Sequence, residues 1–380
     1  MRKGAVIAGI GQTEFSKDSG RSELQLAAEA SRAAIAEAGL RASDIDGTVT
    51  FVLDPNDELA LIRTLGIPEL SYTARTRGGG GGANATIQLA ATAVLSGAAN
   101  AVLVYRAFNE RSGRRFGQPT GQLRDPAWNW YQPYGLDTPA KVYGIIFQRY
   151  MWRYGVTNED FGRYTVAARK YAATNPAAWF YQRPITLADH QASRWIVEPI
   201  LRLLDCCQES DGGVALVVTR EERARDTAQP AVRIVAASQS HLRDGDELFN
   251  YFHANGDSFP EAESLGRRLY ETAGMKPTDI DVAMIYENFS PVVFLQLEAL
   301  GFCGPGEARD FIAEGNIDQG GSLPVNTNGG LLGEAYIHGM NNITEAVRQV
   351  RGTAVNQVAD VNHVLVSSGR SGLILGQSDL

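Results

Sequence analysis

Cysteine is scarce in this sequence, and the spacing of the few that occur argues against two kinds of cross-link. The 380 residues contain three cysteines, Cys206, Cys207 and Cys303, and no Cys-x-x-Cys pair. Structural zinc sites are usually built from such pairs, and two vicinal cysteines are poorly placed to form a disulfide bond. We therefore predict no metal site and no disulfide framework, and we expect the cysteines to be buried free thiols.

Other features that the sequence lacks exclude several classes of function. Lys and Arg number 35 against 43 Asp and Glu, for a formal net charge of -8 at pH 7, so no nucleic-acid partner is expected. No apolar stretch reaches the length of a membrane span, and the apolar run near the N-terminus is too short for a signal peptide. We therefore expect a cytoplasmic protein without membrane contact. The Gly-x-Ser-x-Gly motif of serine hydrolases is also missing.

What the sequence does contain is a repeat. Three segments of the first half recur in the same order in the second: 5–12 as 232–239, 38–46 as 273–281, and 100–104 as 362–366. Conserved order over three matches favours two copies of one βαβ-type unit. We place the two halves at about residues 1–230 and 231–380.

Within each half, apolar strands alternate with amphipathic helices. A helix is predicted over 23–38 and a strand over 45–52, and a helix over 83–95 is apolar nearly all round, which is typical of a buried helix. This order predicts an α/β fold whose mostly parallel sheets lie between layers of helices.

The composition changes between about residues 112 and 202, where all five tryptophans fall. We interpret this segment as an insertion covering the first half, with helices near 139–154, 158–174 and 186–193. Its aromatic side chains can form a core of their own, which is the simpler interpretation, or a lid over a large apolar ligand.

Five consecutive glycines, Gly78–Gly82, lead into the helix predicted over 83–95. Glycine lets a backbone approach a ligand closely, and a helix N-terminus favours an anion or a carbonyl oxygen. A flexible linker is the alternative, and the flanking strand and helix disfavour it. Gly9-x-Gly11 is only a weak dinucleotide signal, because Glu14 stands in place of the third glycine.

A second glycine-rich loop, residues 326–342, leads into a helix predicted from Asn342 to about Val350. An Asn-x-Thr-Glu sequence at its start is typical of a helix cap. The loop presents Tyr336 and His338 at the helix entrance, where oriented N–H groups favour developing negative charge.

Another tyrosine, Tyr286, directly follows a strand predicted over 282–285. Ligands collect at the carboxyl edge of parallel strands in open α/β sheets, so Tyr286 is a site candidate, although packing of its ring alone would explain it equally well. His338 and His253 are acid–base candidates, but a lone histidine is more often structural.

Together, the duplicated halves, the glycine-led helix, Tyr286-Glu287-Asn288-Phe289 and the Asn-x-Asn-Gly-Gly run at 326–330 resemble the thiolase superfamily over nearly the whole chain. The closest resemblance is to its branch of sterol-carrier-protein-thiolase-like lipid-transfer proteins. It implies a duplicated α/β thiolase fold of five layers, αβαβα, with the active site at the junction of the halves, a loop domain inserted in the first half, and a homodimer.

The departures from the thiolase pattern decide the expected chemistry. The place of the nucleophilic cysteine falls in Gly80–Gly82 and that of the second catalytic cysteine falls near Ser367-Ser368-Gly369, and neither holds a thiol. Tyr286 replaces the asparagine of the Asn-Glu-x-Phe motif, and Tyr336 replaces the histidine of the Gly-His-Pro motif. Acyl-cysteine chemistry is therefore not expected, unless one of the three cysteines lies where the family does not predict it.

Tyrosines at both vacated positions resemble the thiolase-like aldolases of bacterial steroid side-chain degradation. The resemblance implies retro-aldol cleavage of a β-hydroxyacyl-CoA, a 17-hydroxy steroid with a three-carbon side chain, to a 17-ketosteroid and propionyl-CoA. One of Tyr286 and Tyr336 would take the hydroxyl proton and the other would protonate the enolate, with the assignment left open. No cofactor is implied beyond the CoA of the substrate, and a small OB-fold partner subunit is implied in a heterotetramer.

Supporting groups are also implied. The backbone amides of Gly81, Gly82 and Gly330, together with His338 and Asn288, would stabilise the thioester oxygen. The residues that bind the steroid are not identified. Two alternatives stay open: a thiolase-like acyl-CoA acyltransferase, which needs a reactive thiol, and a non-catalytic lipid or acyl-CoA carrier, which needs a pocket but no pair of tyrosine hydroxyls.

Overall fold

The computed structural model describes residues 4–113, 115, 117–118, 128–243, 245 and 257–378. The candidate His253 lies outside these residues. The first half contains these elements: β1 Ala5–Gln12, α1 Glu23–Glu37, β2 Gly47–Phe51, α2 Glu58–Leu65, β3 Tyr72–Thr76, α3 Ala83–Ser96, β4 Ala101–Asn109 and β7 Asp211–Arg220.

Between β4 and β7 lies the insertion, and the second half follows β7. The insertion comprises α4 Trp128–Tyr131, α5 Pro139–Tyr154, α6 Asn158–Thr174, α7 Leu187–Ala192, β5 Trp195–Val197 and β6 Leu201–Arg202. The second half comprises β8 Val232–Gln239, α8 Pro260–Ala273, β9 Val282–Ile285, α9 Pro291–Ala299, α10 Ala308–Ala313, α11 Gly330–Gly333, α12 Met340–Arg351, β10 His363–Ser367 and β11 Ser371–Gln377.

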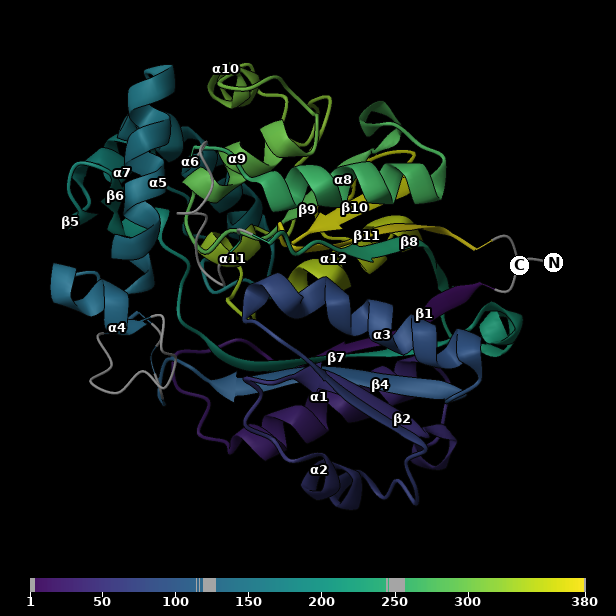
Figure 1. Cartoon of the computed structure of the whole chain (residues 1–380). Coiled ribbons are helices and arrows are strands. Elements are labelled where there is room, and N and C mark those ends of the chain that lie inside the picture. The colour runs from purple at the N-terminus through teal and green to yellow at the C-terminus, as the bar shows by residue number, and fades with distance from the viewer. Residues whose placement is uncertain are drawn as a thin grey trace.

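Five layers stack in the described part of the chain (Figure 1). The helix α1 covers the outer face of the first-half strands, and α8 covers the outer face of the second-half strands. The helices α3 and α12 lie between them, and each contacts strands of both halves. Their side chains suit this position, because most residues of α3 and nearly all residues of α12 are buried. The predicted αβαβα fold is confirmed.

The two halves repeat each other down to individual hydrogen bonds. In each, a helix is followed by a short 3-10 turn, Ala42–Asp44 in the first half and Pro277–Asp279 in the second. The next aspartate then accepts a backbone N–H from the start of a neighbouring strand: Asn100 N donates to Asp46 (2.8 Å) and Asn362 N to Asp281 (2.7 Å). The predicted duplication therefore corresponds to a repeated structural unit.

Strand direction differs from the prediction. The described strands form a continuous sheet in the order β3-β2-β4-β7-β1-β8-β11-β10-β9. Only β3, β2 and β4 at one edge, and β9 and β10 at the other, pair in parallel; the central strands pair antiparallel. The expectation of mostly parallel sheets was wrong, because β7 and β11 return beside β4 and β10 in the opposite direction. The pairing of β4 with β7 is long-range and leaves no local sequence signal, whereas β11 follows β10 after a short turn as an antiparallel hairpin.

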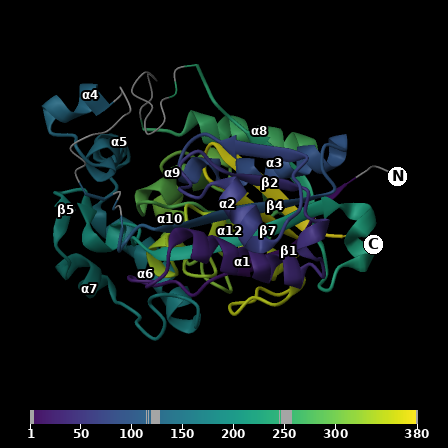
Figure 2. The same cartoon turned by 90° about the horizontal axis from the view of Figure 1, so that it is seen from below.

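The insertion packs against the second half, whereas the sequence had predicted that it covers the first. Figures 1 and 2 place α5, α6 and α7 at one end of the molecule, next to α9. Phe161 of α6 meets Phe294 of α9 edge-on, with ring centroids 5.1 Å apart, and Phe147 of α5 meets Phe289 at 6.2 Å. Because α9 is apolar on nearly every face, it needs such a cover. These aromatic side chains are therefore core.

Two glycines near the N-terminus serve helix packing. A Cβ at Gly9 would lie 2.2 Å from the carbonyl oxygen of Ala34, and a Cβ at Gly11 would lie 2.2 Å from that of Ala30. Both glycines thus let α1 approach β1 closely, which accounts for the Gly-x-Gly pattern without a nucleotide. Within the described residues, no helix combines the length and the apolar character of a membrane span.

Candidate active site

The hydroxyl groups of Tyr286 and Tyr336 form a hydrogen bond, with their oxygens 2.7 Å apart. Their ring centroids are 6.2 Å apart, and the two residues are only 9% and 8% exposed. Tyr286 follows β9, and Tyr336 lies between α11 and α12. The two tyrosines that the sequence singled out, 50 positions apart, therefore share one site.

The backbone of Tyr286 is fixed on both sides. Its N–H donates to the carbonyl of Ser367 on β10 (2.8 Å), which continues the parallel ladder beyond β9. Its carbonyl accepts from the side chain of Gln296 on α9 (2.9 Å), and Ser367 Oγ donates to the other end of that amide (2.7 Å). Tyr286 is therefore held rigidly at the carboxyl edge of the sheet.

Asn326 closes the glycine-rich loop onto the same strand. Its Oδ1 accepts from Ile285 N (2.7 Å), and its Nδ2 donates to Ile285 O (2.8 Å) and to the Tyr164 hydroxyl (2.7 Å). Its φ is 53°, a left-handed conformation that asparagine tolerates better than most residues. The loop therefore carries Tyr336 back to the end of β9.

Buried amides and carboxylates hold the rest of this loop. Glu334 accepts from Asn341 Nδ2 (2.8 Å) and from Asn328 Nδ2. Tyr336 N donates to Ser210 Oγ (3.2 Å), next to β7. Helix α12 begins at Met340, and its N-cap is Gly339 rather than the predicted Asn342. Glycine is used there because φ is 83° and the Tyr286 ring lies within 3.1 Å of the place of a Cβ.

The first glycine-rich segment reaches the tyrosines from the first half. A Cβ at Gly80 would lie 1.9 Å from Cε2 of Tyr286, so only glycine leaves room for that ring. Residues Gly80–Gly82 form a 3-10 turn that leads into α3. The predicted ligand loop thus lies against the tyrosine pair.

The availability of the backbone amides corrects part of the prediction. Gly82 N donates to Gly79 O (3.0 Å), and Gly330 N donates to Asn328 Oδ1 (2.9 Å). Neither amide is therefore available to stabilise a thioester oxygen, and those two assignments were wrong. Gly80 and Gly81 precede the first hydrogen bond of the turn, so their N–H groups are not used within it.

His338 contacts the Tyr336 ring edge-on, with centroids 5.1 Å apart at an interplanar angle of 86°. Its opposite neighbour is Phe108 of β4, stacked at 5.0 Å. Arg106 Nε donates to its Nδ1 (3.2 Å). Burial, and then the positive charge of Arg106, hold the pKa of His338 well below its usual value, so the ring is neutral at pH 7.

Asn288 lies in the turn after Tyr286. Its carbonyl accepts from Cys207 N (2.8 Å), while its Oδ1 is buried and has no hydrogen-bond partner among the described residues. The supporting role predicted for this side chain stays a prediction.

Three residues near the pair were missed. Cys207 packs against Tyr286, Tyr336 and Leu331. Lys17 Nζ donates to Gln208 Oε1 (2.9 Å). Glu110 is 2% exposed and follows β4 directly, and its charge adds a smaller rise to the pKa of both tyrosines, which burial raises most. The sequence places these residues near the ends of first-half elements, which could have marked them as site candidates. It does not show that they approach the second half.

The ionisation states in this cluster follow from burial. Burial raises the pKa of Tyr286 and of Tyr336 well above 10, so both are neutral phenols. It also raises the pKa of the Cys207 thiol and of the Glu110 carboxyl well above their usual values, and lowers the pKa of Lys17 to about 8. All three cysteines are free thiols, as predicted, but they are partly buried rather than fully buried. Because a thiolate is the nucleophilic form, Cys207 is poorly suited to attack an acyl group.

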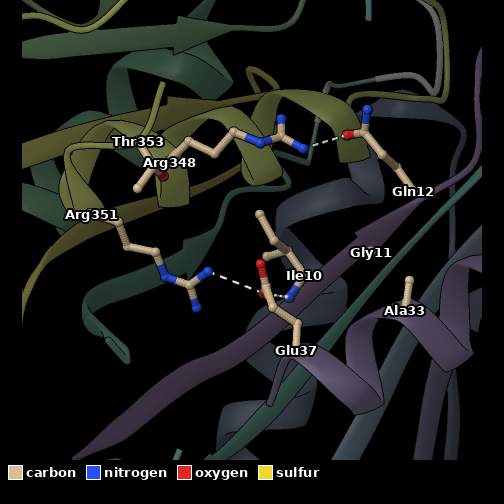
Figure 3. Close-up of a pocket in the computed structure, with 8 residues that line it drawn as sticks. All are labelled: Ile10, Gly11, Gln12, Ala33, Glu37, Arg348, Arg351 and Thr353. Atoms are coloured by element: carbon tan, nitrogen blue, oxygen red, sulfur yellow. Dashed lines mark hydrogen bonds and ion pairs between the residues drawn. The ribbon is translucent and has the colours of Figure 1, made fainter. Parts of the chain in front are cut away.

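A pocket of about 370 Å³ is lined by residues other than the two tyrosines (Figure 3). It is lined by β1, α1 and the end of α12. Its polar groups pair across the two halves, Arg348 with Gln12 (2.7 Å) and Arg351 with Glu37 (3.1 Å). We assign it to the joint between the halves. Elsewhere, the described residues contain no cluster of three His, Cys, Asp or Glu side chains arranged to hold a metal ion.

Comparisons with known proteins identify relatives of this chain. A family model described as thiolase C-terminal domain-like matches residues 255–378. The chain is 56% identical to a steroid side-chain-cleaving aldolase of Thermomonospora curvata, with 98% of this chain and 97% of that protein covered. It is 54% identical to the 17-hydroxy-3-oxo-4-pregnene-20-carboxyl-CoA lyase of Mycobacterium tuberculosis, with 98% and 99% covered.

Solved structures agree with these sequence matches. The Ltp2-ChsH2(DUF35) aldolase superposes with a TM-score of 0.95 at 56% identity, covering 99% of this chain and 98% of that one. Human mitochondrial 3-ketoacyl-CoA thiolase superposes with a TM-score of 0.69 at 14% identity, covering 100% and 99%. The second match shows a shared fold alone.

Proposed function

The chain belongs to the thiolase superfamily and, within it, to the steroid side-chain-cleaving aldolases, and on this premise we propose how its site cleaves a carbon–carbon bond. The protein is a lyase that acts on a steroid CoA thioester. Its substrate is a 17-hydroxy steroid with a three-carbon acyl-CoA side chain, of the 17-hydroxy-3-oxo-4-pregnene-20-carboxyl-CoA type. The products are a 17-ketosteroid and propionyl-CoA.

The observation that carries the mechanism is the hydrogen bond between the two phenols, 2.7 Å long and buried. In a retro-aldol reaction the hydroxyl proton leaves, the C17–C20 bond breaks, and its electron pair forms a thioester enolate. The enolate carbon then takes a proton. The reaction thus moves one proton from oxygen to carbon and needs no covalent intermediate.

Neutral phenols suit this transfer, because each can accept and donate a proton. One tyrosine accepts the substrate proton while it passes its own to the other, and the second tyrosine delivers a proton to the enolate carbon. No free tyrosinate is required, which fits the raised pKa of both residues. This relay uses Tyr286 and Tyr336 together and leaves open which of them faces the hydroxyl.

The negative charge that develops on the thioester oxygen must be stabilised by hydrogen-bond donors. The N–H groups of Gly80 and Gly81 belong to the glycine segment that packs against the Tyr286 ring. The neutral ring of His338 approaches the same segment at Gly79. Oriented donors in a water-poor site are among the largest contributors to catalysis. We assign them to this oxygen.

The alternatives fit less well. An acyltransferase needs a thiolate, whereas the thiol nearest to the pair, Cys207, has a raised pKa. A passive carrier has no use for two phenols in direct contact. We further propose that the protein is a cytoplasmic homodimer that uses no cofactor. We also propose that it binds a small OB-fold subunit in a heterotetramer, and the similar two-component aldolase structure supports a partner subunit.

The direct test is product analysis. The protein, alone and co-purified with its partner subunit, is incubated with 17-hydroxy-3-oxo-4-pregnene-20-carboxyl-CoA, and products are identified by mass spectrometry. We expect the 17-ketosteroid and propionyl-CoA in equal amounts. Acyl transfer to added CoA without a ketosteroid would instead support the acyltransferase, and tight binding without any product would support the carrier.

A further inference from the structure

Arg106 lies within β4 with only 1% of its surface exposed, although arginine is rarely buried. Its Nη1 forms an ion pair with Asp54 Oδ2 (3.0 Å), and its guanidinium lies 4.0 Å from the centroid of the Phe108 ring. Asp54 also accepts from Ala107 N (3.0 Å) and from the side chain of Asn56 (2.9 Å). The carboxylate is therefore fully used, and it holds the guanidinium in one orientation.

A second nitrogen of this guanidinium, Nε, points its N–H at His338. It donates to Nδ1 over 3.2 Å, between residues 232 positions apart. Arginine carries only donors and stays protonated, so Nδ1 must act as the acceptor. A neutral histidine that accepts at Nδ1 carries its proton on Nε2. The contact therefore fixes the tautomer as well as the ring orientation.

The edge of the ring that carries this proton faces the glycine segment. Nε2 lies 3.9 Å from the place that a Cβ would take at Gly79. Gly80 and Gly81, whose N–H groups precede the first hydrogen bond of the turn, come next in the chain. His338 also adopts a φ of 51°, which a residue with a bulky side chain rarely does. Such backbone strain is often retained where it places a functional side chain.

We propose that Arg106, held by Asp54, is a positioning residue that fixes His338 with its proton on Nε2, so that Nε2–H donates to the thioester oxygen of the substrate. The identity of that oxygen rests on the proposed function, whereas the tautomer does not. The arrangement also makes the site depend on both halves, because Asp54 and Arg106 belong to the first and His338 to the second.

The tautomer is tested first, on the full-length protein without substrate. The chain has five histidines, so the ¹⁵N signals of His338 in histidine-labelled protein are assigned by their loss in His338→Gln. We expect one protonated and one unprotonated ring nitrogen at pH 7, with the proton on Nε2. A proton on Nδ1, or on both nitrogens, overturns the proposal, and this result needs no Arg106 variant to fold.

The role in catalysis is tested with Arg106→Met. We expect mixed tautomers at His338 and a kcat lower by on the order of tenfold or more, with a smaller change in KM, because a wrong tautomer removes a transition-state donor. Arg106→Lys, which restores a donor, should recover part of the loss. An unchanged tautomer and an unchanged kcat would overturn the role. Arg106→Met leaves the Asp54 carboxylate unpaired. If that variant does not fold for this reason, the double variant Asp54→Asn with Arg106→Met is used in its place.

A matched control separates positioning from general destabilisation. Arg169 is likewise buried and lies 3.4 Å from a phenylalanine ring, that of Phe180. Arg169→Met should lower the unfolding temperature but leave the His338 spectrum and kcat unchanged. Failure of the tyrosine relay would show separately, as activity retained in Tyr286→Phe and Tyr336→Phe with the wild-type His338 spectrum.

Discussion

At the scale of single residues, the chemistry depends on two phenol oxygens 2.7 Å apart. Sequence motifs located both tyrosines, because each replaces a polar residue in a recognisable pattern. Their contact could not be predicted in the same way, since it depends on how the loop after Asn326 folds back onto the end of β9. Nor could Arg106 be found, because its partner His338 lies in the second half of the chain, 232 positions away.

Removing either phenol oxygen should interrupt the relay. We expect Tyr286→Phe and Tyr336→Phe each to lower kcat by on the order of a hundredfold or more, because a proton transfer is lost while packing is kept. The measurement is steady-state release of propionyl-CoA. Tyr171→Phe is the control, since this buried tyrosine of the insertion donates to Ile317 O of the second half (3.1 Å). Full activity in both site variants would disprove the relay.

The space at Gly80 gives a second prediction. Gly80→Ala places a methyl group where the Tyr286 ring now lies, so the ring must move away from Tyr336. We expect a loss of kcat on the order of tenfold or more, because small displacements of a reacting group are costly. Gly320→Ala, where a Cβ meets no atom within 4 Å, is the control. If Gly80→Ala kept normal turnover, the close packing of loop and ring would have no catalytic importance.

At the scale of elements, the sequence predicted helices better than strand directions. Helix α6 follows the apolar period and begins with a capping box at Thr157 and Asp160. Helix α12 starts earlier than its apparent asparagine cap because tertiary packing places Gly339 in a left-handed turn beneath Tyr286. Strand direction is set by distant partners, so antiparallel β7 could not be recognised.

The turn that joins β9 to α9 carries a buried acid. Glu287 Oε1 accepts from Leu331 N (2.7 Å), and burial raises the pKa of this carboxyl to about 8. The folded protein therefore binds a proton that the unfolded chain, with a pKa near 4.5, releases earlier. This contribution to stability is complete below pH 4.5 and is lost as the pH rises through about 8.

We therefore expect Glu287→Gln to flatten the fall in unfolding free energy between pH 4.5 and about 8. One proton accounts for at most about 1.4 kcal/mol per pH unit. Urea unfolding at several pH values measures this slope. Exposed Glu271→Gln should leave the slope as it is in the wild type. An unchanged slope in Glu287→Gln would mean that the buried carboxyl is already ionised in the folded protein over this pH range.

At the scale of the whole molecule, the site is assembled across the joint of two similar halves. The glycine segment, Asp54 and Arg106 come from the first half, and both tyrosines and His338 come from the second. The ion pair between Arg351 and Glu37 (3.1 Å) and the hydrogen bond from Arg348 to Gln12 (2.7 Å) fasten this joint at a distance from the site.

Weakening the joint should therefore affect both stability and catalysis. We expect Arg348→Ala combined with Arg351→Ala to lower the unfolding free energy by on the order of 2 kcal/mol, since hydrogen bonds to charged groups are lost. The kcat should fall as well, although neither residue touches the tyrosines. Calorimetry and product release measure the two effects. A loss of stability with unchanged kcat would show that the joint does not influence the site.

The ring of Tyr286 occupies the room that a side chain at Gly80 would need, and this has an evolutionary consequence. Of the three glycines at which the thiolase resemblance places the nucleophilic cysteine, Gly80 is blocked by the phenol and Gly82 by the carbonyl of Arg77, 2.6 Å from a Cβ there. A nucleophile and this phenol thus compete for one volume. A variant with a cysteine at position 80 would first have to lose the tyrosine at position 286. The acyl-cysteine chemistry and the tyrosine chemistry therefore exclude each other at this position.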